Sequence, residues 1–529
     1  MSTQGLQAIT PRSFFILFLV LSIPVFLVNL GTVPFIEDEG IRGLVALEMI
    51  HSGNYISPTL YGEAYFKKPP LWNWILVVSY KLFGSANELS TRIPTVFFLF
   101  LFTINIYALT RKYIGEQKAV LSALMFITCG RILFWDSMLG LIDIMFSWMI
   151  FLLFFWIFHF HKKRKWLLLY TGVYALAAIA FMLKALPSLV FLVLSLLTAI
   201  VYFKSWKRLL SWQHLMGIIT FCILVGFYFW LYAREGPITE LLSVFVSEST
   251  QRTAIKYGYW AAILQVGRFP FEMIYHFLPW SLMIVLVFQT KLIAKISQES
   301  LVAFAAITFF VNILIYWSSP EVYPRYLFMF APLLFIVFLH LYGQNGSTSV
   351  KIVDFALCLV ATVVFLGSFY VFFNEDTRQL PGLGWKWFIS ALPMGGSLIH
   401  MVRFRRQRLY SLCIFLIAAR LGFSLIVLPV RGENDLVAQT RRDAYRIASR
   451  VGEEPLRILQ HDTMRYEAGF YLTSSLGKVI SVTQDSTDKA YLLVNLDKYT
   501  TLQTQFKKID SMRVKREEQY VYLVKALAD

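Results

Sequence analysis

Long apolar runs recur along this chain, and they constrain its fold more than any other feature. The first run, from Ser13 to Val33, is about 20 residues long, enough for a helix to cross a hydrocarbon core of roughly 30 Å. It has no signal-peptide cleavage pattern, so we interpret it as a permanent span. The sequence predicts a polytopic α-helical membrane protein with about 13 transmembrane helices, at residues 13–33, 88–108, 117–135, 141–160, 166–183, 186–203, 214–232, 273–290, 301–318, 326–342, 352–373, 384–401 and 409–430.

The formal net charge of +17 could suggest binding to nucleic acid, but the positions of the basic residues favour another explanation. They cluster in every second connection between the apolar runs, beginning after the second run. This asymmetry is typical of cytoplasmic loops, so it predicts a cytoplasmic amino terminus and a carboxy-terminal region on the outer side, with no nucleic-acid partner. The clusters are Arg111, Lys112 and Lys118; Lys162, Lys163, Arg164 and Lys165; Lys204, Lys207 and Arg208; Lys291 and Lys295; and Arg403, Arg405, Arg406 and Arg408.

The composition changes after about Pro429, which indicates two domains, a membrane domain at residues 1–430 and an outer domain at residues 431–529. About 100 residues suffice for one small domain. The hydrophobic periodicity predicts an α/β domain with a helix at 436–451, strands at 456–460, 478–482 and 491–495, and a hairpin-like pair within 512–524. The four cysteines lie in apolar segments, where they are typical of small core residues rather than of disulfides or metal ligands.

The first outward connection, from Glu37 to Pro70, carries acids and amines at one membrane boundary. It opens with three acids, continues with an amphipathic pattern that predicts a helix along the membrane surface, and ends with Tyr65, Lys67 and Lys68 before a Pro-Pro stop. Further polar residues follow in later outward connections: Arg131, Asp136, Asp143, Lys184, Arg252, Arg325 and Tyr326.

This combination suits transfer of a sugar from a lipid-linked phosphate. Such a reaction needs a carboxylate to activate or orient the acceptor hydroxyl, and cations to neutralise the departing phosphate. Simpler interpretations remain open: Lys67 and Lys68 can extend toward lipid headgroups, Asp38 and Glu39 can be solvated turn residues, and Asp136 and Asp143 can cap helices.

The first outward loop also resembles a known family. The segment reads Asp38-Glu39, then Glu48-Met49, Ser52-Gly53, Pro58, Gly62 and Tyr-Phe-Lys-Lys-Pro-Pro at residues 65–70. It is similar to the first outer loop of the GT-C glycosyltransferases grouped with the bacterial aminoarabinose lipid A transferase and the protein O-mannosyltransferases. The close match covers about 35 residues, and the pattern of spans with a small outer domain resembles the bacterial branch over the whole chain.

The resemblance implies roles for individual residues. Asp38 matches the catalytic aspartate, with Glu39 beside it, and either Asp143 or Asp136 matches a second acid. Tyr65, Lys68 and Lys184 match residues that contact the donor phosphate, although Ala185 stands where the Lys-Gly-Pro motif has glycine. Lys67 adds a cation beside this group, and Arg252, Arg325 and Tyr326 fall where the family has further phosphate-facing residues.

Two departures from the aminoarabinose branch affect the donor and the metal. Lys67 stands where that branch has Glu, which makes an aminoarabinose donor a less natural fit. Glu248 is followed by Ser249 where the branch has a Glu-His pair, so the expected metal ligands are not kept and we assign no metal-binding residue.

From these observations we expect an inverting hexosyl- or pentosyltransferase of the bacterial inner membrane. The implied partners are a polyprenyl-phosphate-linked sugar, membrane lipids, and a lipid A-like lipid, glycan or protein acceptor on the periplasmic side. The alternative is a transporter or flippase of lipid-linked glycans. Such proteins usually place ionisable residues near the middle of the bilayer, whereas here they gather at one face.

Overall fold

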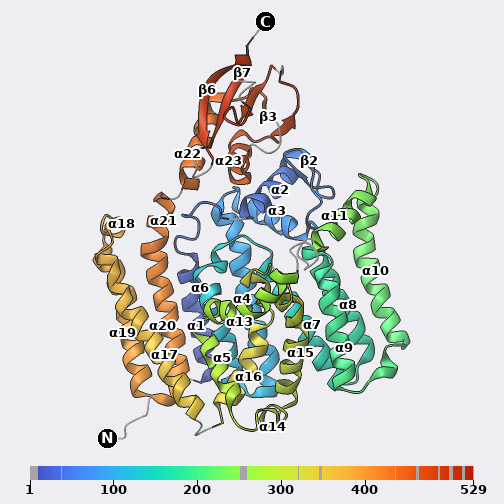
Figure 1. The fold of residues 1–529 in the computed structure, drawn as a ribbon, viewed down its shortest axis with the longest axis vertical. Helices are drawn as coiled ribbons and strands as arrows, with labels where there is room; N and C mark the ends of the chain where they lie inside the picture. Colours follow the sequence, from blue (N-terminus) through green and yellow to red (C-terminus); the bar gives the residue numbers. More distant parts are fainter. Residues whose placement is uncertain are drawn as a thin grey trace.

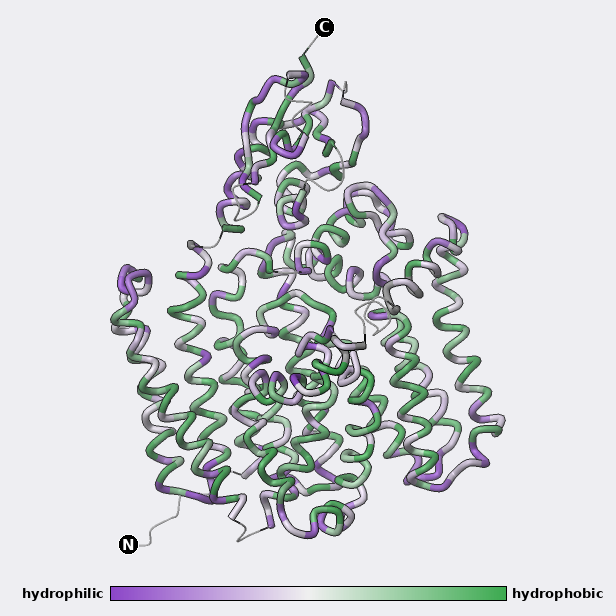
Figure 2. The backbone as a smooth tube through the Cα atoms, in the orientation of Figure 1, coloured by the Kyte–Doolittle hydropathy of each residue, from purple (hydrophilic) through white to green (hydrophobic). Residues whose placement is uncertain are grey.

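The computed structural model is a tall helical body with a small mixed sheet at one end (Figure 1). It describes residues 10–36, 38–250, 259–319, 321–344, 348–434, 436–459, 464–486, 489–499, 504–514 and 519–527. The amino-terminal helix α1 begins at the end of the body opposite the sheet. Apolar segments dominate the helical body, and polar segments are concentrated at its ends and in the sheet region (Figure 2).

The helical body begins with α1 and ends with α21, and small helices and turns interrupt it. The larger helices are α1 (Pro11–Leu27), α2 (Glu39–Ser52), α3 (Leu71–Phe83), α4 (Glu88–Ile114), α5 (Glu116–Ile127), α7 (Asp143–Lys162), α8 (Trp166–Lys184), α9 (Pro187–Tyr202), α10 (Trp212–Tyr232), α11 (Ile238–Thr250), α13 (Tyr259–His276), α15 (Ser300–Trp317), α16 (Ala331–Tyr342), α17 (Thr348–Gly367), α19 (Leu383–Arg403) and α20 (Arg408–Gly422). The shorter elements are β1 (Thr59–Leu60), β2 (Glu63–Ala64), α6 (Gly130–Phe134), α14 (Leu292–Ile296), α18 (Glu375–Arg378) and α21 (Leu428–Asn434).

The predicted membrane-protein class agrees with this body, but thirteen spans are not confirmed. In the described part of the chain, seven helices are long and apolar enough to cross a membrane, or eight if the bent pair α5 and Gly130–Met138 counts as one. Several predicted spans are shorter helices, including α1, α9 and α16. The run predicted at 273–290 is divided between the end of α13 and a 3₁₀ segment, Trp280–Phe288, that follows Pro279, because proline cannot continue the helical hydrogen-bond ladder.

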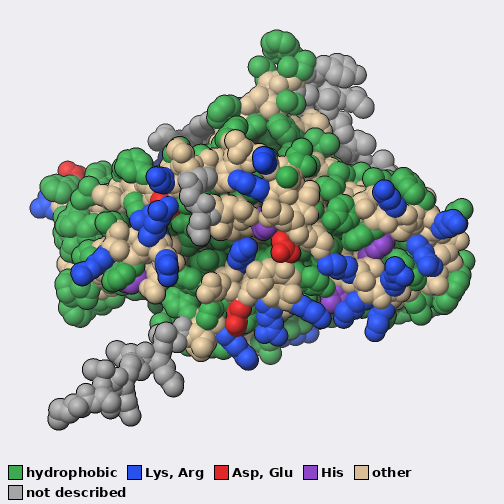
Figure 3. All heavy atoms as spheres, turned by 90° about the horizontal axis from the view of Figure 1, so that it is seen from below, with side chains coloured by type: hydrophobic (Ala, Val, Ile, Leu, Met, Phe, Trp, Pro, Cys, Tyr) green, Lys and Arg blue, Asp and Glu red, His purple; other side chains and the backbone are tan. Residues whose placement is uncertain are grey.

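Lys and Arg side chains cluster on the lower face of the body, and few acidic side chains accompany them there (Figure 3). This face lies opposite the sheet and includes the connection between α19 and α20. The distribution agrees with the alternating basic connections in the sequence, while the orientation of the termini across a membrane stays a prediction.

The carboxy-terminal region forms a five-stranded sheet with the strand order β4-β3-β5-β7-β6. β3 pairs in parallel with β4 and β5, whereas β7 pairs antiparallel with β5 and β6. Helix α22 buries Ala444, Ile447, Ala448 and Val451, which is the helical spacing that made it predictable. The elements are α22 (Leu436–Val451), β3 (Leu456–Leu459), α23 (Tyr466–Leu476), β4 (Ser481–Thr483), β5 (Tyr491–Val494), β6 (Phe506–Arg513) and β7 (Tyr520–Ala526).

Helix α2 lies beneath this region instead of along a lipid surface. It packs against α23 on one side and α3 on another, and Leu44, Val45 and Met49 are fully buried. The contact with α23 is close, because a Cβ on Gly40 would lie 2.8 Å from the backbone nitrogen of Glu467. The amphipathic pattern therefore reflects packing between two protein layers.

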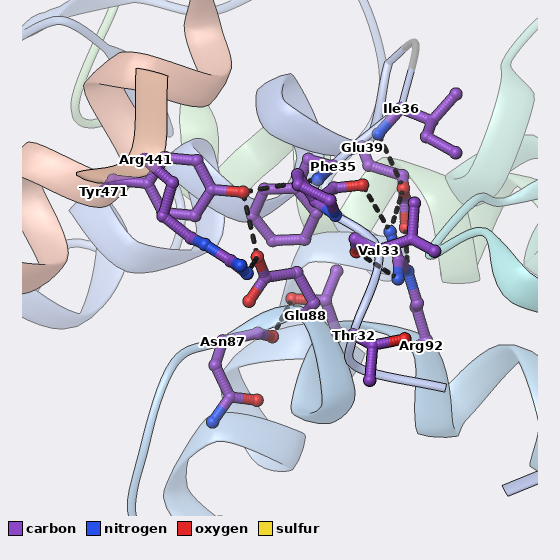
Figure 4. A network of polar contacts seen from close by, with 12 residues as sticks. Thr32, Val33, Phe35, Ile36, Glu39, Asn87, Glu88, Arg92, Arg441 and Tyr471 are labelled. Atoms are coloured by element: carbon purple, nitrogen blue, oxygen red, sulfur yellow. Dashed lines mark hydrogen bonds and ion pairs between the residues drawn. The ribbon is translucent and has the colours of Figure 1, made fainter. Parts of the chain in front are cut away.

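A buried polar network joins the carboxy-terminal region to the helical body (Figure 4). Glu88, at the start of α4, accepts hydrogen bonds from the Tyr471 hydroxyl at 2.9 Å and from Arg441 at 2.7 Å. The Tyr471 hydroxyl in turn accepts from the backbone nitrogen of Phe35 at 3.3 Å. The start of α4 is fixed by a capping box between Asn87 and Ser90. Glu88 is thus held where α22, α23 and the first loop meet.

We predict that Glu88→Ala weakens the attachment of the carboxy-terminal region. The change leaves Arg441 and Tyr471 without their acceptor, and hydrogen bonds to a charged group contribute about 1.5–3 kcal/mol each. Thermal unfolding in detergent should occur at a lower midpoint, and trypsin should release a carboxy-terminal fragment faster. Glu375→Ala, at an exposed position on α18, is the control. Equal midpoints for the two variants would contradict the prediction.

Candidate active site

Glu39 is fully buried and connects the first two outward connections. Its two carboxylate oxygens accept from Arg92 of α4 at 2.9 and 2.8 Å, in a bidentate pair that Figure 4 displays. They also accept from the backbone nitrogens of Ile36 at 2.9 Å and Gly140 at 2.7 Å. Arg92 donates further to the carbonyls of Leu30, Val33 and Pro34. Glu39 therefore holds the two segments together, and both of its carboxylate oxygens are engaged by these contacts.

Asp38, the neighbouring acid, is exposed, whereas Glu39 is buried. It is the residue that precedes α2, and its side chain is 52% exposed. Arg325, from the 3₁₀ turn Pro324–Leu327, extends one guanidinium nitrogen to within 3.8 Å of the Asp38 carboxylate. Its Nε lies 3.6 Å from the carboxylate of Asp143. A buried cation therefore lies between two acids from different loops.

Asp143 and Lys184 meet because α7 and α8 are consecutive, packed helices. Asp143 is the first residue of α7 and Lys184 is the last residue of α8, and their charged groups are 2.5 Å apart. The Lys184 ammonium also lies over the ring of Tyr326, 4.3 Å from its centre. Asp38, Arg325, Asp143 and Lys184 thus form a continuous series of alternating charges, which we call the charge cluster.

The end of α8 explains one residue of the family motif. Ala185, which follows Lys184, has a φ of 54°, a conformation that favours glycine. The resemblance implies glycine at this position, whereas this chain has a strained alanine, at a cost on the order of 1–3 kcal/mol. The strained residue directs the chain into α9 immediately after Lys184.

Tyr65 is buried beside a residue that the sequence analysis missed. Arg42 donates a hydrogen bond to the Tyr65 hydroxyl at 2.7 Å. Arg42 as a whole is 5% exposed. Arg42 lies one helical turn after Asp38, the residue that precedes α2. The spacing of four residues between an acid and a base is the sequence signal that could have identified Arg42 as a candidate site residue.

Glu48 of the family motif supports the hairpin that precedes Tyr65. It accepts from the Thr59 hydroxyl at 2.6 Å and from the backbone nitrogens of Tyr61 at 2.7 Å and Gly62 at 3.2 Å. Burial raises the pKa of the Glu48 carboxyl, and these hydrogen bonds partly offset the increase. Its position indicates that Glu48 shapes the loop and does not contact the charge cluster.

The other predicted residues have different surroundings. Asp136 pairs with Arg131 at 2.6 Å, so Asp143 and not Asp136 is the acid that contacts Lys184 and Arg325. Lys67 is exposed and Lys68 is half-buried, both just before α3. Arg252 lies outside the described residues. The catalytic and phosphate-binding roles of all these residues stay predictions.

A metal site would need several ligands in one place. Among the residues that the structure describes, no three His, Cys, Asp or Glu side chains are grouped in this way. The side chains of Glu248 and Ser249, where the resemblance implies a Glu-His pair, lie outside the described part. Serine is not a substitute for histidine as a metal ligand, so these two residues do not fit the implied pair.

Comparison with known proteins gives a family context for this geometry. Residues 67–232 match the family model described as dolichyl-phosphate-mannose-protein mannosyltransferase. The fold matches the crystal structure of ArnT from Cupriavidus metallidurans bound to undecaprenyl phosphate, with a TM-score of 0.68 over 97% of this chain and 98% of that chain, at 18% identity. The chain resembles the GT-C glycosyltransferases. Its fold is that of a GT-C membrane protein, and the resemblance inferred from the first loop is confirmed.

Curated relatives match the chain over limited regions. An uncharacterized protein of Aquifex aeolicus is 27% identical over 50% of the chain and 54% of its own length. The undecaprenyl phosphate-alpha-4-amino-4-deoxy-L-arabinose arabinosyl transferase of Pseudomonas savastanoi is 34% identical over 18% of each protein. The chain therefore spans about half of the first relative and about a fifth of the second.

We predict that the two adjacent acids respond differently to amidation. Glu39→Gln leaves Arg92 as a buried charge without its anion, which costs about 3–5 kcal/mol, so the thermal midpoint should fall sharply. Asp38→Asn alters a half-exposed carboxylate with a 3.8 Å contact and should change the midpoint little. Thermal unfolding in detergent is the measurement. A larger loss of stability for Asp38→Asn would reverse the assignment of the two acids.

Proposed function

We propose that this protein is an inverting glycosyltransferase that moves a sugar from a polyprenyl-phosphate carrier to an acceptor. One observation carries the proposal: buried Arg325 lies between exposed Asp38 and Asp143, and Asp143 pairs with Lys184. Two cations and one exposed acid at the same end of a helical body provide both functions that the reaction needs. The similarity of the fold to an ArnT bound to undecaprenyl phosphate supports a lipid phosphate as the donor group.

In this mechanism the cations bind the phosphate of the donor. Arg325 and Lys184 neutralise the charge that develops on the phosphate oxygen when its bond to the anomeric carbon breaks. Asp143 orients both cations, because it contacts each of them. Tyr65, Lys68, Arg252 and Tyr326 complete the phosphate site in this proposal, with Lys67 near its rim, and Arg42 orients the Tyr65 hydroxyl.

Asp38 acts on the acceptor. When the acceptor is a hydroxyl, its oxygen forms the new bond to the anomeric carbon on the face opposite the phosphate, and its proton passes to Asp38. When the acceptor is a phosphate, it is already ionised at neutral pH and Asp38 orients it. In both cases the configuration at the anomeric carbon is inverted, and the carrier leaves as polyprenyl phosphate.

The cellular setting follows from the same relatives. We infer a multi-pass protein of the bacterial inner membrane, with its amino terminus in the cytoplasm and the charge cluster and residues 431–529 on the periplasmic side. The relatives named as undecaprenyl phosphate-dependent arabinosyl transferases support a lipid-phosphate donor. Lipid A-like, glycan and protein acceptors, and hexose as well as pentose donors, are included in the proposal. No residue is assigned to metal binding, and a divalent metal ion stays compatible with the proposal.

A transporter or flippase of lipid-linked glycans is less consistent with the charge cluster. Alternating-access transporters generally place their binding groups near the middle of the membrane between repeated halves. In this chain the charged residues lie at the starts and ends of helices, including the first residue of α7 and the last of α8. That location favours chemistry at one membrane face.

We predict that Asp38→Asn lowers the rate of sugar transfer by about 10²–10⁴, because the acceptor loses its base or orienting carboxylate. The substrates to compare are radiolabelled undecaprenyl-phosphate aminoarabinose and polyprenyl-phosphate mannose, with membrane lipid as the acceptor. Asp376→Asn, at an exposed position on α18, is the control. Unchanged transfer by Asp38→Asn would exclude Asp38 from the mechanism, and movement of the lipid-linked sugar across proteoliposomes without transfer would favour the flippase.

We also predict that Lys184→Met weakens binding of the carrier phosphate. Loss of one charge-assisted hydrogen bond weakens the binding free energy by about 1.5–3 kcal/mol, so the Kd for undecaprenyl phosphate should increase about 10- to 100-fold. Lys207→Met, an exposed lysine in the basic connection before α10, is the matched control. The same Kd for wild type and Lys184→Met would place the phosphate elsewhere.

A further inference from the structure

A second polar site lies at the opposite end of the helical body, away from the charge cluster. A cavity of about 1340 Å³ opens between α1, α19 and α20 and is also lined by residues of α5, α16 and α17. Sites for drug-sized ligands are about 300–1,000 Å³, so the cavity is large for an inorganic ion. It lies at the lower end, where many Lys and Arg and few acidic side chains are at the surface (Figure 3).

The charges around the cavity are positive. Arg405 and Arg406, from the 3₁₀ turn Arg405–Gln407, line it together with His400. Among its described lining residues there is no Asp or Glu. Two acids adjoin the lining without belonging to it: Asp354 of α17, a buried carboxylate that Arg405 contacts at 2.9 Å, and Glu116, next to Gln117. An occupant of this cavity should therefore carry negative charge.

The carboxylate of Asp354 pairs with neighbours of Arg406 and not with Arg406 itself. This carboxylate pairs with Arg405 at 2.9 Å and with Arg408 at 2.7 Å, and it accepts from the Tyr342 hydroxyl at 2.5 Å. These contacts fix the turn between α19 and α20. Arg406 is exposed, and within the described chain no hydrogen bond or ion pair is assigned to it. It is the cation best placed to meet an anionic group in the cavity.

The lining is apolar as well as basic, which indicates an amphiphile. Phe14 of α1, Val350 of α17 and Ile414 of α20 line the same cavity as the arginines. Helices α17 and α19 also expose large apolar side chains, among them Phe355 at 69% and Ile399 at 69%, as surfaces in contact with lipid do. Basic pockets between transmembrane helices on the cytoplasmic side commonly bind anionic lipid headgroups.

We propose that this cavity binds the phosphate headgroup of an anionic glycerophospholipid from the surrounding bilayer. Arg406 contacts the phosphate, Arg405 supplies a second positive charge, and the acyl chains pass between α1, α19 and α20. The site is separate from the charge cluster, and it does not depend on the proposed transferase activity.

Two variants and one matched control test the site in the full-length protein. Arg406→Gln removes the cation from the cavity, and Arg403→Gln removes an exposed cation three residues earlier that does not line it. Gly396→Leu fills the cavity without changing charge, because a Cβ at Gly396 meets no atom within 4 Å. Leucine also favours the helical conformation more than glycine, so the helix should form normally.

The measurement is binding of phosphatidylglycerol to delipidated protein in neutral detergent, followed by native mass spectrometry, with phosphatidylcholine and inorganic phosphate as comparison ligands. We expect Arg406→Gln to weaken phosphatidylglycerol binding about fivefold and Gly396→Leu to weaken it at least as much, with Arg403→Gln close to wild type. Equal losses for Arg406→Gln and Arg403→Gln, equal binding of phosphatidylcholine, or displacement of the lipid by millimolar phosphate would each overturn the proposal.

Discussion

The buried pair of Glu39 and Arg92 fixes the geometry on which the candidate site depends. Arg92 binds the carbonyls of Leu30, Val33 and Pro34 in the segment before α2, and Glu39 binds the backbone nitrogen of Gly140 in the connection before α7. Asp38 precedes Glu39 directly, and Asp143 follows Gly140 by three residues. One ion pair therefore determines the separation of two acids from segments about 100 residues apart, and Arg325 occupies the space between them.

The charge cluster pairs two acids with two cations in a partly buried environment. Arg325 is almost fully buried and Lys184 is mostly so, and each has a carboxylate as a neighbour. Removing either acid would leave a desolvated cation, which is costly, and the same desolvation strengthens the attraction for a phosphate. The cluster thus offers an anion two mostly buried cations, Arg325 and Lys184, that share Asp143 as a neighbour.

Parts of this structure could be predicted from local patterns. Helix α22 follows from its buried positions at helical spacing, and the gathering of Asp38, Asp143, Lys184 and Arg325 follows from charged residues placed at one face of the apolar runs. The division of the run at 273–290 was less visible, because hydropathy does not register the effect of Pro279 on the helix. The burial of α2 beneath α23 depended on residues more than 400 positions away.

The sequence could not predict that Asp38 is exposed and Glu39 is buried. Two adjacent acids at a helix start point in directions about 100° apart, so only one can face the interior. Which one does so depends on Arg92, a partner 53 residues away that no spacing rule identifies. Arg42 was missed for a related reason, because its partner Tyr65 arrives only when the hairpin fixed by Glu48 returns the chain to α2.

The most direct test of the account is a cryo-electron microscopy structure of the full chain with undecaprenyl phosphate. The central claim is that the charge cluster receives the carrier headgroup. The account predicts phosphate density within hydrogen-bonding distance, about 3 Å, of both Arg325 and Lys184, with Asp38 facing the open side of the site. Density for the phosphate bound elsewhere, with the contacts of Arg325 and Lys184 to Asp143 unchanged and the cluster unoccupied, would contradict it.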